Sequence, residues 1–153
     1  MKPALNSTVS SSEWEELTLT VDSGASETVL GRKACPQIPI RESAGSQSGV
    51  EYETASGEHI PNEGEKVMQV STTEGQLRTL TMQICDVKKP LMSVRKMCAV
   101  GQRVVFDDEW SYVEDKTTGD RTTIEESGGV YTMKVWVRPP QPYVQGGFPW
   151  PGQ

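Results

Sequence analysis

Polar and apolar residues alternate along most of the chain, and this alternation predicts a protein built mainly of β-strands. In WEELTLTVD (14–22), Leu17, Leu19 and Val21 fall on one face and polar residues fall on the other, which is typical of a half-buried strand. The strand runs directly into Asp22 and then into a turn of small residues. A lone carboxylate is therefore expected at the end of a strand.

Small residues and prolines divide the rest of the chain into hairpins and one helix. A first hairpin is expected within 50–70, with its tip at 55–57, and a second has its tip at 73–75. Residues 37–49 predict a wide loop, because they contain proline, glycine and several serines. The only convincing helical period lies in SVRKMCAVG (93–101), which begins with an N-capping serine and ends with glycine. Further strands are expected at 103–108, 110–115, 120–126 and 129–137.

Composition limits the classes of protein that this chain can belong to. With 153 residues, 35% hydrophobic and 7% aromatic, it suits one domain (14–138) with a modest core, a flexible leader (1–13) and a Pro/Gly-rich tail or linker (139–153). A net charge of −6 argues against direct binding of nucleic acid. No run approaches the roughly 18 apolar residues of a membrane span, and the N-terminus lacks the apolar core of a signal peptide. We therefore expect an intracellular protein without a membrane partner.

The residue types that usually bind metals give no clear site. Cys35, Cys85 and Cys98 are odd in number and lack C-x-x-C spacing, so we expect buried reduced thiols and neither a disulfide framework nor a zinc site. His59 is the only histidine and is expected at the surface. The acids at 107–109 are sequence neighbours whose side chains point apart, which disfavours a carboxylate metal site. No metal and no cofactor are expected.

The turn after Asp22 has the composition of a tight loop that fixes a carboxylate. Gly24 lets the backbone approach closely, and the Ser23 hydroxyl can bond a neighbouring backbone group. Water activation by carboxylates needs a second carboxyl group that stays protonated. The only similar turn, KTTGDR, has Thr117 in the place of the acid, so the second carboxylate must come from another copy of the chain. The alternative is that Asp22 is only a turn acid bonded to its own loop.

At this point the motifs resemble a known family. VDSGASETVL (21–30) resembles the active-site signature of the retroviral-type aspartic proteases, the retropepsins, and YETASGEHIPNEGE (52–65) resembles their flap hairpin. CDVKKPLMSVRKMCAVGQRVVFDD (85–108) resembles a segment of copia-type LTR retrotransposon polyproteins, and DKTTGDRTTIEESGGVYTM (115–133) continues that likeness. The resemblance covers about residues 17–133, which is most of the chain.

Two residues depart from the retroviral pattern. Ser23 stands where threonine is common, and this change keeps the hydroxyl group. Ser93 stands where the retroviral pattern has glycine, whereas the copia-type pattern has serine there. The second departure therefore moves the resemblance toward the copia type.

The resemblance implies a mostly β, retropepsin-like closed barrel with a flap hairpin and one short α-helix. It also implies a homodimer in which two Asp22 carboxylates, about 3 Å apart, share one proton, so that one activates water while the other polarises the scissile carbonyl. Ser23 and Gly24 would hold this catalytic dyad in place across the dimer axis. The substrate-binding residues that it implies are Ala25 in the loop and Thr54, Ala55, Ser56 and Gly57 at the flap tip.

The implied function is cleavage of peptide bonds during maturation of a retrotransposon polyprotein, in the cytoplasm or within a virus-like particle. The partners would be a second copy of the chain and a peptide or polyprotein substrate. Two alternatives stay open: a non-catalytic retropepsin-like module for dimerisation or peptide binding, and a folded spacer within a polyprotein. The alternative for the flap tip, residues 54–57, is an ordinary hairpin turn.

Overall fold

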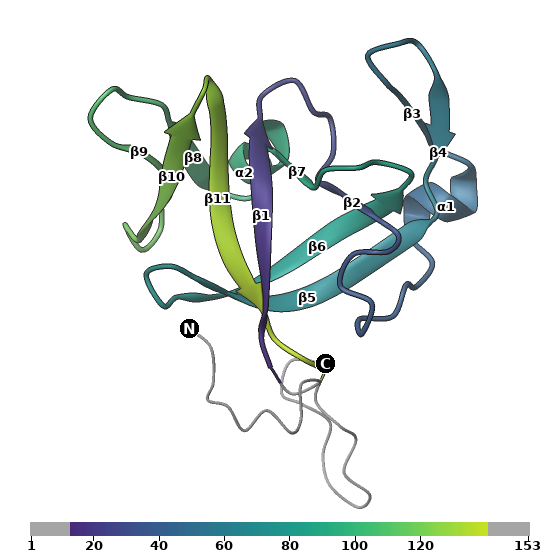
Figure 1. The fold of residues 1–153 in the computed structure, drawn as a ribbon, viewed down its shortest axis with the longest axis horizontal. Coiled ribbons are helices and arrows are strands. Elements are labelled where there is room, and N and C mark those ends of the chain that lie inside the picture. The colour runs from purple at the N-terminus through teal and green to yellow at the C-terminus, as the bar shows by residue number, and fades with distance from the viewer. Residues whose placement is uncertain (1–12, 141–153) are drawn as a thin grey trace, which may run out of the picture.

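The computed structural model describes residues 13–140, and the predicted leader and tail lie almost wholly outside them. This part of the chain is a mostly β protein with two short helices (Figure 1). The elements are β1 (Glu15–Asp22), β2 (Val29–Gly31), α1 (Ala44–Ser48), β3 (Glu51–Glu53), β4 (His59–Pro61), β5 (Gly64–Thr72), β6 (Leu77–Cys85), β7 (Leu91–Ser93), α2 (Val94–Ala99), β8 (Gln102–Val105), β9 (Ser111–Asp115), β10 (Arg121–Ser127) and β11 (Val130–Val137).

Nine of these strands form one mixed sheet, part of which closes on itself. Its pairings run from β1 through β7, β2, β6, β5 and β11 and return to β1, while β10, β9 and β8 extend outward from β11. β3 and β4 form a separate two-stranded sheet. Figure 1 shows this small hairpin projecting from the body, as the sequence predicts for 50–70.

The main hydrophobic core is built from strands of this ring together with side chains of β9, β10 and α2. The alternation in β1 turns Leu17, Leu19 and Val21 inward, where each is at most 8% exposed. In the antiparallel register of β1 and β11, Leu17 lies opposite Val135 and Leu19 lies opposite Met133, so apolar side chains meet across the two strands. The half-buried strand predicted at 14–22 is confirmed.

A lysine is among the most completely buried side chains of the described residues. Lys66 on β5 is 2% exposed, and its Nζ donates hydrogen bonds of 2.8 Å to both Ala34 O and Cys35 O. Cys35 has the unusual φ of 51°, so the ammonium group binds a sharply turned loop. Burial lowers the pKa of Lys66 from its ordinary value.

The prediction of a single helix is wrong, because α1 forms inside the expected loop 37–49. Ser43 caps the helix in a reciprocal capping box with Ser46, and Gly49 ends it in the left-handed conformation with φ of 75°. α1 has five residues and none of them is buried, so no apolar period could reveal it. The predicted helix at 93–101 is confirmed as α2, with Ser93 as its N-cap.

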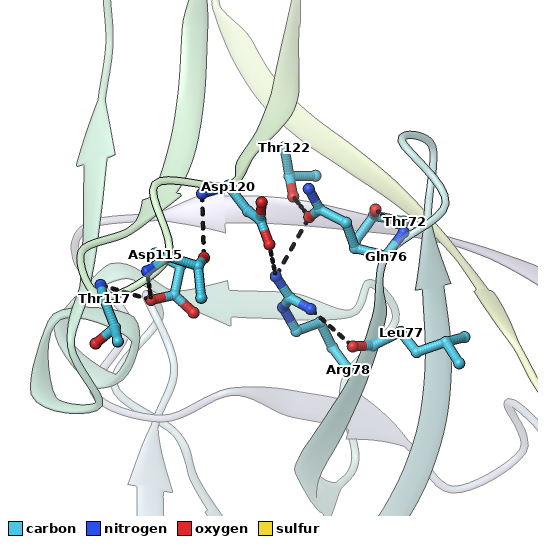
Figure 2. A network of polar contacts seen from close by, with 9 residues as sticks. Thr72, Gln76, Leu77, Arg78, Asp115, Thr117, Asp120 and Thr122 are labelled. Atoms are coloured by element: carbon cyan, nitrogen blue, oxygen red, sulfur yellow. Dashed lines mark hydrogen bonds and ion pairs between the residues drawn. The ribbon is translucent and has the colours of Figure 1, made fainter.

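The second predicted hairpin is confirmed as β5 and β6, and its turn is attached to the turn between β9 and β10 (Figure 2). Arg78 approaches Asp120 Oδ2 at 3.2 Å, and Gln76 Oε1 accepts a 3.5 Å hydrogen bond from Thr122. Glu74 Oε2 also accepts a hydrogen bond of 3.0 Å from the Thr123 N–H. The strands predicted after the helix are confirmed as β8 to β11, with bounds that differ by one to three residues. No helix within residues 13–140 has the length and apolarity needed to cross a bilayer.

Candidate active site

Asp22 is the last residue of β1 and begins a tight loop. The parallel pairing of β1 with β7 places Asp22 opposite Ser93. The Gly24 N–H donates a hydrogen bond of 2.7 Å to Asp22 Oδ1, and the Ala25 N–H lies 3.4 Å from Asp22 O. The half-buried carboxylate is therefore held by the backbone of its own loop. This geometry fits both a catalytic acid and a turn acid.

The small residues after Asp22 have different roles. A Cβ atom added to Gly24 would lie 3.3 Å from Asp22 Oδ1, which is tighter than ordinary contact, so glycine gives the carboxylate its space. Ser23 is exposed, and its hydroxyl makes no hydrogen bond within the described part of the chain. The sequence suggested a bond from that hydroxyl to a neighbouring backbone group, and the described residues contain none. Ala25 is half-buried and presents its carbonyl group to α2.

Two buried hydroxyl groups, those of Ser93 and Thr28, support the loop that carries Asp22. Ser93 is fully buried, and its Oγ donates a hydrogen bond of 2.7 Å to Ala25 O while accepting one of 3.1 Å from Lys96 N. The Ser93 N–H in turn donates to Thr28 Oγ1 at 3.0 Å. Ser93 thus attaches the start of α2 to the loop that carries Asp22. An ion pair of 3.1 Å between Lys96 and Glu27 adds a second link.

The sequence identified Ser93 as a helix cap and as a departure from the retroviral pattern, but not as a partner of the Asp22 loop, and it did not single out Thr28. The signal for Ser93 was its position between an apolar pair and a helix, but its second partner, Ala25, lies 68 residues earlier in the chain. Such a contact depends on β1 and β7 being neighbours, and this pairing is not visible in local patterns.

The predicted flap forms the tip of the β3–β4 hairpin. The Thr54 N–H donates to Glu58 O at 2.8 Å, the Gly57 N–H donates to Thr54 O at 2.9 Å, and Gly57 has φ of 88°. Thr54 Oγ1 and Ser56 Oγ lie 3.0 Å apart, and Ala55 at the turn is exposed. The tip is therefore ordered by its own hydrogen bonds.

The base of this hairpin is anchored to the body by Asn62. The Asn62 Nδ2 group donates to Tyr52 OH at 2.8 Å and to Gln83 Oε1 at 2.9 Å. Its Oδ1 accepts hydrogen bonds from the Gly64 N–H at 2.8 Å and from Ser43 Oγ at 3.1 Å. One buried amide side chain thus joins the hairpin to β5, β6 and α1.

A groove of about 520 Å³ separates the Asp22 loop from the hairpin base. Ser26 and Glu27 line it on the side of the loop, and Tyr52 lines it on the side of the hairpin. Asp22 and the flap tip are not among its lining residues. The structure therefore brings Asp22, Ser23, Gly24 and Ala25 together on one loop, and keeps the tip residues 54–57 on a separate projecting hairpin.

The other candidate groups lie apart from this loop. Within residues 13–140 no hydrogen bond or ion pair joins Asp22 to a second carboxylate, and no cluster of three or more metal-binding side chains occurs.

Burial raises the pKa of the Cys35 and Cys85 thiols to about 11. The prediction of buried thiols is wrong for Cys98, because that residue lies on the exposed side of α2. His59 is at the surface, 3.3 Å from Glu51.

Comparisons with protein-family models, with curated proteins and with solved structures found no match to this chain.

Proposed function

We propose that this chain is an aspartic endopeptidase with a retropepsin-like closed-barrel fold, active as a homodimer through Asp22 of each copy. The observation that carries the proposal is the support of the Asp22 loop on two sides. The Gly24 N–H fixes one carboxylate oxygen at 2.7 Å, and the buried Ser93 holds the Ala25 carbonyl group at 2.7 Å. A surface turn acid does not need the second support, whereas a catalytic carboxylate has to be held in one geometry. Strand β1, which ends at this loop, belongs to the ring of strand pairings, and that ring is compatible with a closed barrel.

The proposed mechanism uses two Asp22 carboxyl groups that share one proton. The ionised carboxylate removes a proton from water, and the resulting hydroxide forms a bond to the scissile carbonyl carbon. The other carboxyl group gives its proton to the carbonyl oxygen, which produces a neutral tetrahedral intermediate. The carboxyl group that took the water proton then gives it to the amide nitrogen, while the other carboxylate takes a proton from one hydroxyl group of the intermediate. The C–N bond breaks as the carbonyl group reforms, and the dyad again holds one proton. Ser23 and Gly24 would keep the two groups in one plane.

The proposed substrate is an extended peptide within a polyprotein. Such a peptide can pair its backbone with the flap hairpin, and closure of the tip, Thr54 to Gly57, would exclude water from the reacting bond. Ala25, whose N–H donates to Asp22 O, would contact the same peptide. By resemblance to copia-type retrotransposon proteins, the biological substrate would be the polyprotein that contains this chain, and cleavage would occur inside the cell.

The test is cleavage of a mixed peptide library by the wild-type chain and by Asp22→Asn, in mildly acidic buffer with high salt. Asp108→Asn serves as a matched control, because Asp108 is an exposed carboxylate outside the loop. Cleavage that is lost in Asp22→Asn and kept in Asp108→Asn is the expected result. Equal cleavage by both variants would rule out the proposed dyad. A folded dimer that cuts no peptide would favour the binding module.

A further inference from the structure

The edge of β6 that faces away from β5 is covered over only part of its length. β6 has nine residues, and β2 pairs with only the last three, 83–85. The Gln83 N–H donates to Thr28 O at 2.9 Å, so it points away from β5. Because the backbone groups of a strand alternate in direction from residue to residue, those of Thr79 and Thr81 point the same way. In the described part of the chain these groups have no backbone partner on that side.

A groove of about 540 Å³ runs along this open edge. Thr79 and Thr81 line it on one side, and Met97 on α2 and Val100 directly after α2 line it on the other. Its floor belongs to the main core and includes the buried side chain of Met133. Val100 at the rim is 75% exposed. An open strand edge beside uncovered apolar surface indicates a site that receives another strand.

The charges at the rim of the groove are already paired. Arg78 contacts Asp120 Oδ2 at 3.2 Å, as Figure 2 shows, and Lys96 contacts Glu27 Oε2 at 3.1 Å. A charged side chain placed in the groove would therefore have no free counterion. A strand added to a sheet edge bonds mainly through its backbone. The groove thus favours an uncharged segment in an extended conformation.

Two segments of this chain lie outside the described residues, the N-terminal segment 1–12 and the C-terminal segment 141–153. The C-terminal segment contains three prolines, and proline cannot donate to a strand ladder. The N-terminal segment carries no charge between residues 4 and 12. Its Leu5 and Val9 fall on the same face of an extended chain, so both can point toward an apolar floor. The N-terminal segment therefore matches the groove.

The strand registers place the N-terminal segment within reach of this edge. Glu15 lies opposite Val137, which lies opposite Val70. Val70 in turn lies opposite Arg78 on β6. The start of β1 is therefore level with the start of the open edge, at three strand spacings or about 14 Å along the sheet. The chain from Val9 to Glu15 makes six residue steps, which reach up to about 20 Å.

We propose that residues 4–9 of this chain occupy the groove as an added strand, antiparallel to the open edge of β6. The direction follows from the registers, because Val9 enters at the level of Arg78 and the segment then continues toward β2. The added strand completes the edge that β2 leaves open and packs against α2, whose N-cap holds the Asp22 loop. This inference goes beyond the proposed function and does not depend on it.

Amide hydrogen exchange in the full chain, followed by NMR, tests the pairing. In the wild type the amides of Thr79 and Thr81 should exchange slowly, because the added strand accepts their hydrogen bonds. Leu5→Asp combined with Val9→Asp places two unpaired charges in the groove, and exchange at both amides should rise about tenfold or more. The Leu80 amide points to β5 and should stay slow, which reports that the sheet remains folded.

The matched control is Ser11→Asp combined with Ser12→Asp. It adds the same two charges outside the pairing segment and should exchange like the wild type. Fast exchange at Thr79 and Thr81 in the wild type would overturn the inference. Slow exchange that persists in the double variant of the pairing segment would also overturn it, because another group would then cover the edge.

A variant of β6 tests the same contact from the other side. Thr79→Pro removes an N–H that points into the groove, so pairing with β5 is kept. The amides of residues 4–9 should be protected in the wild type and lose this protection in Thr79→Pro. Thr79→Val keeps the N–H and should retain the protection. Equal protection in the two variants would refute pairing with β6, and none of these measurements requires peptide cleavage.

Discussion

Replacing Ser93 with alanine removes one hydroxyl group that joins the Asp22 loop to α2. The Ser93 Oγ atom donates to Ala25 O and accepts from Lys96 N, and the side chain is fully buried. Loss of an N-cap costs about 0.5–2 kcal/mol, and a buried carbonyl without its donor costs about 1–3 kcal/mol. Because the two effects share one side chain and Ala25 is only half-buried, we expect a loss of about 2–3 kcal/mol in the free energy of unfolding.

The measurement is urea unfolding of Ser93→Ala followed by intrinsic fluorescence, with Ser127→Ala as the control. Ser127 is exposed at the end of β10, and its hydroxyl makes no hydrogen bond in the described part of the chain. The control should stay within about 0.5 kcal/mol of the wild type, as is usual for surface substitutions. If Ser93→Ala is equally neutral, the reasoning that this hydroxyl supports the loop is refuted. If Ser93→Ala also cleaves the peptide library more slowly than its loss of stability explains, Ser93 has the further role of positioning Asp22.

Three further predictions concern groups outside the loop. Lys66→Met should lower the free energy of unfolding by about 2 kcal/mol, since two carbonyl groups lose their donor; unchanged urea midpoints would contradict this. A thiol reagent should modify Cys98 rapidly and Cys35 and Cys85 only after unfolding; fast reaction of all three thiols would show that the core opens readily. The hydrogen bond from Arg32 lowers the pKa of Glu63 below its ordinary 4.5, so the pair stabilises the fold above pH 4.5 and loses this effect as pH falls. Glu63→Gln should therefore lower the free energy of unfolding by less than about 1 kcal/mol at neutral pH, because the pair is partly exposed, and should leave it unchanged in acid. Urea unfolding at both pH values measures this, and an equal loss at both would exclude the ion pair as the cause.

The sequence by itself determined the elements whose signals are local. Alternation predicted β1 and the strands from β8 to β11, and small residues predicted the turns of both hairpins. The capping serine and the apolar spacing predicted α2. Asp22 at the end of a strand also followed from residues 14–25 alone. Each of these features depends on neighbours within a few positions, which is the range over which strand and helix periods act.

The tertiary structure decided the features that depend on distant residues. β11 returns to β1 with Glu15 opposite Val137, and this pairing closes the ring. The burial of Lys66 and the exposure of Cys98 reverse the usual preferences of their side chains, because the environment of each depends on which elements lie beside it. The contact between Ser93 and the Asp22 loop likewise exists only because β1 and β7 are neighbours. A local pattern can specify which face of a strand is apolar, but only the pairing of strands decides what that face contacts.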